Sequence, residues 1–152
     1  MDLEEDFKEF LELLIANDVR FLIVGGYALA AHGLPRTTTD IDIWVWMDAQ
    51  NANALKKCLD DFGFGSLEIE QADFLRPDIT VQLGYSPDRI DLMTSISGVV
   101  FEEAWERRIL ATLAGVTLPI IGKTDLVTNK WVLRRPQDLV DLMKLVRQAQ
   151  RE

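Results

Sequence analysis

The spacing of apolar and polar residues along the chain predicts alternating helices and short strands. In residues 2–17 the apolar side chains recur every three or four positions, which places them on one face of a helix. Residues 49–62 show the same spacing and are followed by Gly63, a residue type that often ends a helix. Further helices are expected at residues 27–32, 101–107, 124–133 and 136–150.

Strands are predicted where short runs of β-branched and aromatic residues are bounded by turn-forming residues. Such runs occupy residues 20–24, 39–47, 79–83, 89–95, 108–114 and 116–121. Turn residues at 84–88 and Gly115 join the last four runs in two pairs. The pattern predicts a mixed α/β (α+β) fold, in which a small mixed β-sheet is flanked by helices and two helices end the sequence. We expect one domain over residues 1–152.

The composition excludes several classes of protein. Hydrophobic residues make up 48% of the chain and charged residues 27%, which is typical of a globular domain. The apolar runs are too short to cross a bilayer, so no membrane association is expected. A net charge of -9 argues against broad, sequence-independent binding to nucleic acid, because phosphates require clustered Lys and Arg. Basic residues gather after residue 130, which leaves room for a local basic groove.

The cysteine content and the start of the chain indicate a compartment. The single cysteine, Cys58, has no partner for an internal disulfide, which fits a reducing cytoplasm. Because it lies in the predicted helix 49–62, we interpret it as a packing residue rather than a nucleophile. Residues 1–6 are acidic and lack the basic start of a secretory signal. The expected location is therefore cytoplasmic.

Two aspartates one residue apart stand in the apolar run 39–47. A carboxylate in an apolar strand is costly unless it is neutralised, so packing alone does not explain Asp40 and Asp42. Because residues i and i+2 of a strand point the same way, both carboxylates are expected on one face, with Ile41 and Ile43 on the other. Paired carboxylates of this kind suit a divalent cation such as Mg²⁺, which takes oxygen ligands.

A third carboxylate, Asp91, occupies the apolar run 89–95. If its strand lies next to that of Asp40 and Asp42, three carboxylates converge. Such sites hold two metal ions roughly 3.5–4 Å apart for in-line phosphoryl chemistry. The local context allows Asp91 equally well to be an edge-strand or turn-end residue.

Gly25 and Gly26 lie between the predicted strand 20–24 and the predicted helix 27–32. A strand that ends in two glycines and leads into a helix directs backbone N–H groups towards one point, where phosphate oxygens are favoured. Without side chains, the two residues also let a triphosphate approach the backbone. Alone they indicate only a tight turn, but together with the following aspartates they favour a nucleotide site.

These elements resemble the signature of a known superfamily. Val24-Gly25-Gly26-Tyr27, followed by the segment from Arg36 to Ile43, is similar to the motif of the DNA polymerase β-type nucleotidyltransferases. Those enzymes combine a Gly-Gly or Gly-Ser element with an Asp-x-Asp or Asp-x-Glu strand, and a later strand bears a third carboxylate. Asp91 is the counterpart of that carboxylate here.

A narrower resemblance concerns small stand-alone members of the superfamily. Arg36 and Thr38 before the aspartates, Asn129-Lys130, and residues 135–138 resemble nucleotidyltransferase-like proteins related to the AbiEii type of toxin. The likeness covers about residues 5–147 and implies a nucleotidyltransferase-like sheet. Gln137 stands where related proteins often have a basic residue.

The resemblance implies transfer of a nucleoside monophosphate from an NTP to an acceptor, with release of pyrophosphate. The choice of NTP stays open, ATP included. Asp40, Asp42 and Asp91 would be catalytic and would hold Mg²⁺ or Mn²⁺, and Asp91 would also accept the proton of the acceptor hydroxyl. The residues implied to bind the nucleotide are Gly25, Gly26, Arg36, Thr38 and Lys130.

The acceptor and the setting remain open. A protein, an RNA or a small molecule could accept the nucleotide, and a partner protein encoded alongside would fit a toxin–antitoxin or phage-defence pair. The alternative is a binding module of the same fold, such as an antitoxin-like subunit, which exposed apolar surface on the first helix would favour. A metal-dependent hydrolase is a third interpretation. Trp44 and Trp46 could wall a base-stacking slot, although packing in the core is favoured.

Overall fold

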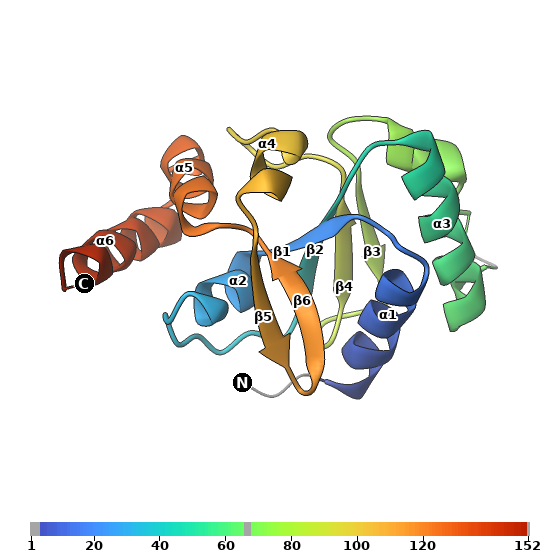
Figure 1. Ribbon diagram of the computed structural model, residues 1–152, viewed down its shortest axis with the longest axis horizontal. Coiled ribbons are helices and arrows are strands. Elements are labelled where there is room, and N and C mark those ends of the chain that lie inside the picture. Colours follow the sequence, from blue (N-terminus) through green and yellow to red (C-terminus); the bar gives the residue numbers. More distant parts are fainter. Residues whose placement is uncertain (1–3, 66–67, 152) are drawn as a thin grey trace.

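The computed structural model describes residues 4–65 and 68–151, which form a six-stranded mixed β-sheet with helices on both faces (Figure 1). The strands are β1 (Phe21–Val24), β2 (Ile41–Val45), β3 (Thr80–Leu83), β4 (Ile90–Met93), β5 (Ile109–Leu113) and β6 (Val116–Ile120). Their order in the sheet is β3-β4-β2-β1-β6-β5. Strand β2 is parallel to β4 and antiparallel to β1, while β1 is parallel to β6. The predicted fold class is therefore confirmed.

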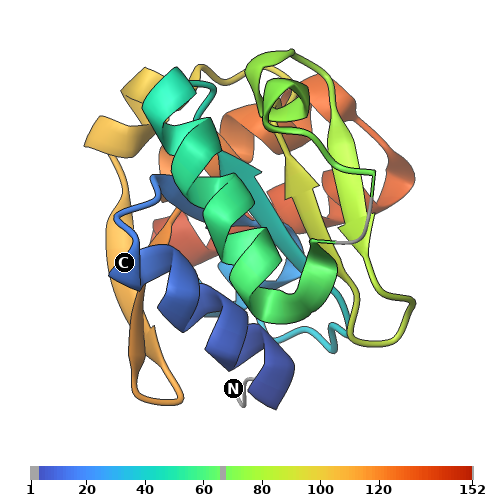
Figure 2. The same ribbon diagram turned by 90° about the vertical axis from the view of Figure 1, so that its right-hand side faces the viewer.

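The helices lie in two layers. They are α1 (Glu5–Ala16), α2 (Gly25–Ala31), α3 (Ala49–Leu59), α4 (Phe101–Glu106), α5 (Lys123–Leu133) and α6 (Pro136–Arg151). Figure 2 shows α1 and α3 in front of the sheet and α5 and α6 behind it. Two short helical turns, Asp60–Phe64 and Gln71–Leu75, lie between α3 and β3.

The central strands are covered on both faces, and this explains their sequences. All four residues of β1 are buried, and so are four of the five residues of β2. A strand buried on both faces has a continuous apolar sequence instead of alternating apolar and polar residues. On one side, α1 contributes Phe7, Phe10, Leu11 and Leu14, all fully buried. Burying each such side chain stabilises the fold by roughly 1.5–3 kcal/mol, before the entropy of ordering it is subtracted.

Most predicted elements occur within a few residues of their expected bounds. The first predicted helix began at residue 2, and its residues 2 and 3 lie outside the described residues. Strand β2 is shorter than the predicted 39–47, because Asp40 lies in a bend before it. The short 3-10 helix Gln71–Leu75 was not predicted; it starts with a capping box between Glu70 and Asp73.

Trp44 fixes α4 on the sheet. Its ring makes an edge-to-face contact with Phe101, with centroids 5.0 Å apart, and its Nε1 donates to the Thr94 carbonyl at 3.2 Å. Trp46 also contacts this helix, through a hydrogen bond from its Nε1 to Glu102 Oε1 at 3.1 Å. The interpretation of Trp44 as a core residue is confirmed.

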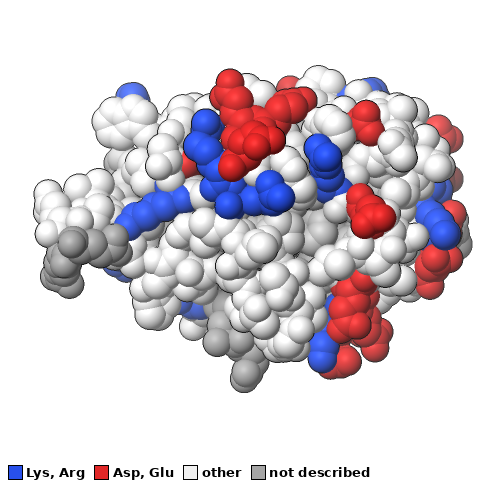
Figure 3. All heavy atoms as spheres, viewed as in Figure 1, with Lys and Arg blue, Asp and Glu red and all other residues white. Residues whose placement is uncertain are grey.

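Charged side chains of both signs lie in small groups on the face shown in Figure 3, including an acidic group over α4 with basic side chains beside it. Glu102 and Glu103 of α4 and the adjacent Arg107 and Arg108 are all exposed. Within residues 4–65 and 68–151, no helix is long and apolar enough to cross a membrane.

Candidate active site

The structure places Asp42 and Asp91 side by side. Strands β2 and β4 are parallel neighbours, and Asp42 and Asp91 are direct partners in their register. On its other side Asp42 faces Val24 of β1, the residue before Gly25. Directly opposed residues of neighbouring strands project from the same face of a sheet. Asp91 therefore lies on an interior strand next to Asp42 and is not an edge-strand residue, while its role as a metal ligand stays a prediction.

The Asp42 carboxylate is not fully neutralised. Burial and the adjacent Asp91 raise the pKa of Asp42 to about 6, and the charge of Asp40 adds to this effect. Arg89 lowers the pKa of Asp42, but more weakly. At neutral pH Asp42 is thus ionised in a partly buried position beside Asp91, an arrangement that favours binding of a cation.

Gly25 allows Asp42 to occupy its position. Gly25 begins α2 with a φ of +69°, and a Cβ built on it would overlap Asp42 Oδ2. A Cβ on Gly26 would lie 2.9 Å from Thr38 Oγ1. Both glycines are therefore required by close contact with this chain's own side chains. Their expected contact with phosphate stays a prediction.

Asp40 is held by the turn before β4. Its Oδ2 accepts a hydrogen bond from Ser86 Oγ at 2.7 Å, and its Oδ1 accepts one from the Arg89 backbone N–H at 3.0 Å. The bond from Ser86, followed by that from Arg89, lowers the pKa of Asp40. Thr38 Oγ1 donates to the Asp40 carbonyl at 3.0 Å and so shapes the bend.

Lys130 belongs to a buried ionic network. Its Nζ lies 3.1 Å from Asp138 Oδ1 and 3.0 Å from Asp141 Oδ2, and both aspartates of α6 are inaccessible to solvent. Arg36 pairs with Asp141, and Arg135 Nε donates to Asp138 at 2.7 Å. Burial alone would raise the pKa of Asp138, but hydrogen bonds from Arg135 and Lys130 bring it to about 2. Three cations surround two carboxylates, so one positive charge is left over.

Arg36 and Lys130 therefore serve first to attach α6 to the rest of the protein. Asp141 Oδ2 has no aligned hydrogen-bond donor in the described residues, although Lys130 Nζ is close. The proximity matters more here than the alignment, because the attraction between full charges depends mainly on distance. The predicted contacts of Arg36 and Lys130 with a nucleotide remain a prediction.

A cleft of about 310 Å³ joins Asp42 to this network. It is lined by Val24, Gly25, Asp42, Met93, Ser95, Ile96, Ser97, Leu126, Asn129, Lys130, Leu133 and Arg135. The hydrogen bond to Asp138 is the main cause that raises the pKa of Arg135, and the charge of Asp42 adds a smaller effect. The lining of the cleft thus combines one carboxylate with two cationic side chains, Lys130 and Arg135.

The residues at this site fit a divalent cation only in part. The described residues contain no group of three or more His, Cys, Asp or Glu side chains that could hold a metal ion. Asp42 and Asp91 provide hard oxygen donors, whereas Asp40 is directed to Ser86 and Arg89. Mg²⁺ is commonly bound through one or two carboxylates together with substrate phosphates and water. The pair therefore fits a cation that arrives with a nucleotide.

Two arginines at the site are absent from the catalytic and nucleotide-binding residues predicted above. Arg89 donates to Asp91 through Nε at 2.7 Å and Nη2 at 3.1 Å, and Arg135 lines the cleft. Arg89 precedes Asp91 by two positions, and the alternation of a strand could have placed it on the same face. The position of Arg135 depends on the packing of α5 and α6, which sequence periodicity does not give.

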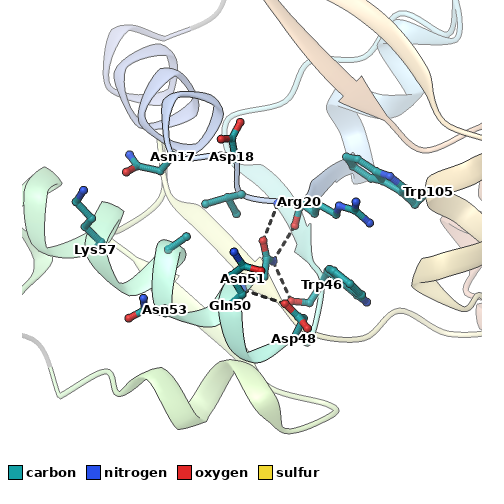
Figure 4. Close-up of a pocket in the computed structure, with 12 residues that line it drawn as sticks. Asn17, Asp18, Arg20, Trp46, Asp48, Gln50, Asn51, Asn53, Lys57 and Trp105 are labelled. Carbon is teal, nitrogen blue, oxygen red and sulfur yellow. Dashed lines mark hydrogen bonds between the residues drawn. The ribbon is translucent and has the colours of Figure 1, made fainter.

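A larger pocket of about 710 Å³ lies elsewhere, between the ends of α1 and β2 and the start of α3 (Figure 4). In it the Arg20 guanidinium lies over the rings of Trp46 and Trp105, 5.0 and 5.4 Å from their centroids. Asn51 points into its centre but is bonded to the backbone of Arg20 and Trp46. None of the predicted site residues lines this pocket. The smaller cleft, which contains one of the paired carboxylates, is the candidate active site.

Solved structures with the same arrangement of sheet and helices define the class. A proposed nucleotidyltransferase from Thermotoga maritima (TM1012) aligns with 93% of this chain and 90% of its own, with a TM-score of 0.60 and 15% identity. The lincosamide antibiotic adenylyltransferase LnuA, bound to lincomycin, aligns with 95% of this chain and 96% of its own, with a TM-score of 0.58 and 19% identity. The protein has the nucleotidyltransferase fold.

The family follows from the sequence as a whole. Residues 1–148 match the family of nucleotidyltransferases of unknown function called DUF6036. The chain belongs to this family. No curated protein matches it.

The raised pKa of Asp42 predicts how stability depends on pH. Because its folded pKa of about 6 exceeds the ordinary 3.8, ionisation of Asp42 destabilises the fold progressively from about pH 4 and fully above pH 6. Asp42→Asn should therefore gain stability relative to the native chain as pH rises, by on the order of 2 kcal/mol between about pH 4 and pH 8. Urea unfolding in EDTA measures this change.

Asp73→Asn is the matched control for this series, because hydrogen bonds lower the pKa of that surface carboxyl. The unfolding free energy of Asp73→Asn should therefore fall relative to that of the native chain as pH rises. A stability difference for Asp42→Asn that stays constant with pH would contradict the account of the pair.

Gly25→Ala tests the close contact between Gly25 and Asp42. Gly25 and Gly115 both have positive φ, but a Cβ on Gly115 would meet nothing within 4 Å. Gly115→Ala should cost about 1–2 kcal/mol of unfolding free energy, the cost of the left-handed conformation alone. Gly25→Ala should cost about 1–3 kcal/mol more, because it also displaces Asp42. Equal losses of unfolding free energy in Gly25→Ala and Gly115→Ala, measured by denaturant unfolding, would show that the position of Asp42 does not depend on Gly25.

Proposed function

We propose that this protein is a divalent-cation-dependent nucleotidyltransferase that moves a nucleoside monophosphate from an NTP to an acceptor. The observation that carries the proposal is the adjacent pair Asp42 and Asp91 beside Gly25, in which Asp42 is incompletely neutralised. Lys130 and Arg135 in the lining of the cleft support it, because they supply positive charge where a triphosphate would lie.

The reaction needs groups that bind the triphosphate and a group that receives a proton. An acceptor hydroxyl oxygen attacks the α-phosphorus, the bond from that phosphorus to the bridging oxygen breaks, and pyrophosphate leaves with the electron pair. The hydroxyl proton passes to a carboxylate of the Asp42–Asp91 pair. Backbone N–H groups at Gly25 and Gly26 contact the phosphates, and Arg135 and Lys130 offset the charge on the departing pyrophosphate.

Asp42 and Asp91, with Asp40 beside them, would hold Mg²⁺ or Mn²⁺. The cation would supply charge neutralisation on the triphosphate and lower the pKa of the attacking hydroxyl. Arg36 and Thr38 act indirectly in this proposal. Arg36 holds α6 through Asp141, and Thr38 shapes the bend at Asp40.

The acceptor is proposed to approach from outside the cleft. A volume of about 310 Å³ is at the small end of ligand sites and suits part of a nucleotide rather than a nucleotide together with an acceptor. LnuA is named for adenylyl transfer to a lincosamide, which makes a small hydroxylated molecule one candidate class beside protein and RNA.

A docking function is the second candidate, and a specific surface favours it. On α1, Ile15 is 41% exposed, whereas the other large apolar residues of this helix are buried or partly buried. Six exposed large apolar side chains lie on α5 and α6: Trp131, Val132, Leu139, Val140, Met143 and Val146. A partner encoded alongside, as in a toxin–antitoxin pair of the AbiEii type, would bind there.

Label transfer tests the reaction. The native chain is incubated with Mg²⁺ or Mn²⁺, each α-phosphate-labelled NTP in turn, and the protein, RNA and small-molecule fractions of a cell lysate. Asp42→Asn and Asp91→Asn should each reduce transfer at least about 100-fold, because each removes a group that contacts the reacting atoms. Asp60→Asn, which alters a surface carboxylate paired with Lys56, should leave transfer unchanged.

Label on one fraction with the native chain alone would identify the acceptor class. Tight NTP binding without any transfer would instead favour the docking function. Full activity in both site variants would refute the assignment of the carboxylates.

A further inference from the structure

Arg89 occupies the carboxylates that would hold the cation. Its guanidinium donates to both oxygens of Asp91, at 2.7 and 3.1 Å, and its Nη2 lies 3.5 Å from Asp40 Oδ2. A bidentate bond between arginine and a carboxylate is among the stronger hydrogen-bonded ion pairs. Asp91 therefore already has a counter-ion that belongs to the protein itself.

The guanidinium is placed where it can leave. The Arg89 side chain is 28% exposed, whereas that of Asp91 is only 10% exposed. The backbone N–H of Arg89 separately holds Asp40, so movement of the side chain would not release the turn before β4. Arginine also binds phosphate oxygens in the same bidentate manner, so a triphosphate offers it an equivalent partner.

We propose that Arg89 is a displaceable counter-ion, which keeps divalent cations from binding before the nucleotide and moves to the triphosphate when both arrive. This inference rests on the proposed function and adds a positioning residue to it. Cation and nucleotide then bind cooperatively: the cation removes Arg89 from Asp91, and the triphosphate receives it. Free protein binds the cation weakly because a positive charge must first be moved.

A purely structural role for Arg89 makes a different prediction. If its side chain only joined β4 to the bend at Asp40, its removal would lower stability and leave cation affinity unchanged or reduced. Arg89→Gln distinguishes the counter-ion role from the structural role, since it keeps the backbone hydrogen bond to Asp40 and removes the charge beside Asp91.

The experiment measures Mn²⁺ binding by titration calorimetry or electron paramagnetic resonance, with and without α,β-methylene-ATP. Without nucleotide, Arg89→Gln should bind Mn²⁺ about tenfold or more tightly than the native chain, because a charge this close shifts an equilibrium by at least that factor. The factor by which nucleotide tightens Mn²⁺ binding should be smaller in the variant. Arg76→Gln, which removes a surface arginine paired with Asp73, should match the native chain.

Arg89→Lys keeps the charge but not the bidentate geometry, so its affinity for Mn²⁺ should lie between those of the native chain and Arg89→Gln. This variant provides the test if Arg89→Gln does not fold. Native protein that binds Mn²⁺ and nucleotide together, with Arg89→Gln no tighter for Mn²⁺ alone, would overturn this inference and leave the proposed function intact. Native protein that binds no Mn²⁺ even with nucleotide would overturn both.

Discussion

The repulsion between Asp42 and Asp91 is the constraint on which the site depends. The parallel register of β2 and β4 fixes these two residues as neighbours, and burial prevents water from separating their charges. Packing gives no reason to keep such a pair, because apolar residues at both positions would be more stable. The sheet therefore holds an unfavourable arrangement that a bound cation would relieve.

The surroundings of the pair are organised around this charge. Gly25 makes room for the Asp42 carboxylate, Arg89 neutralises Asp91, and the hydrogen bonds of Ser86 direct Asp40 away. In the lining of the cleft, Lys130 and Arg135 are positioned by two aspartates of α6 that are themselves inaccessible to solvent. Helix α6 thus contributes to the site indirectly, because it orients cations that α5 and the residues after it present to the cleft.

Sequence patterns predicted the sheet and the position of Asp42 in an apolar strand, because these depend on strand periodicity and local composition. They offered the position of Asp91 beside that strand as one of two interpretations, and the register of β2 and β4 confirms that position. They did not predict the partners of Arg36 and Lys130. Arg36 contacts Asp141, which is more than one hundred positions away, and no local pattern encodes such a pair. The bend at Asp40 was missed for a similar reason. The hydrogen bonds that hold this bend before the strand come from Ser86 and Arg89, on a turn distant in sequence.

The most direct test of the central claim is diffraction from crystals grown with Mn²⁺ and α,β-methylene-ATP, with data collected at the manganese absorption edge. We expect an anomalous peak within coordinating distance of carboxylate oxygens of both Asp42 and Asp91, with the phosphates against Gly25 and Gly26. A nucleotide bound in the larger pocket beside Trp46, or Mn²⁺ bound away from this pair, would contradict it.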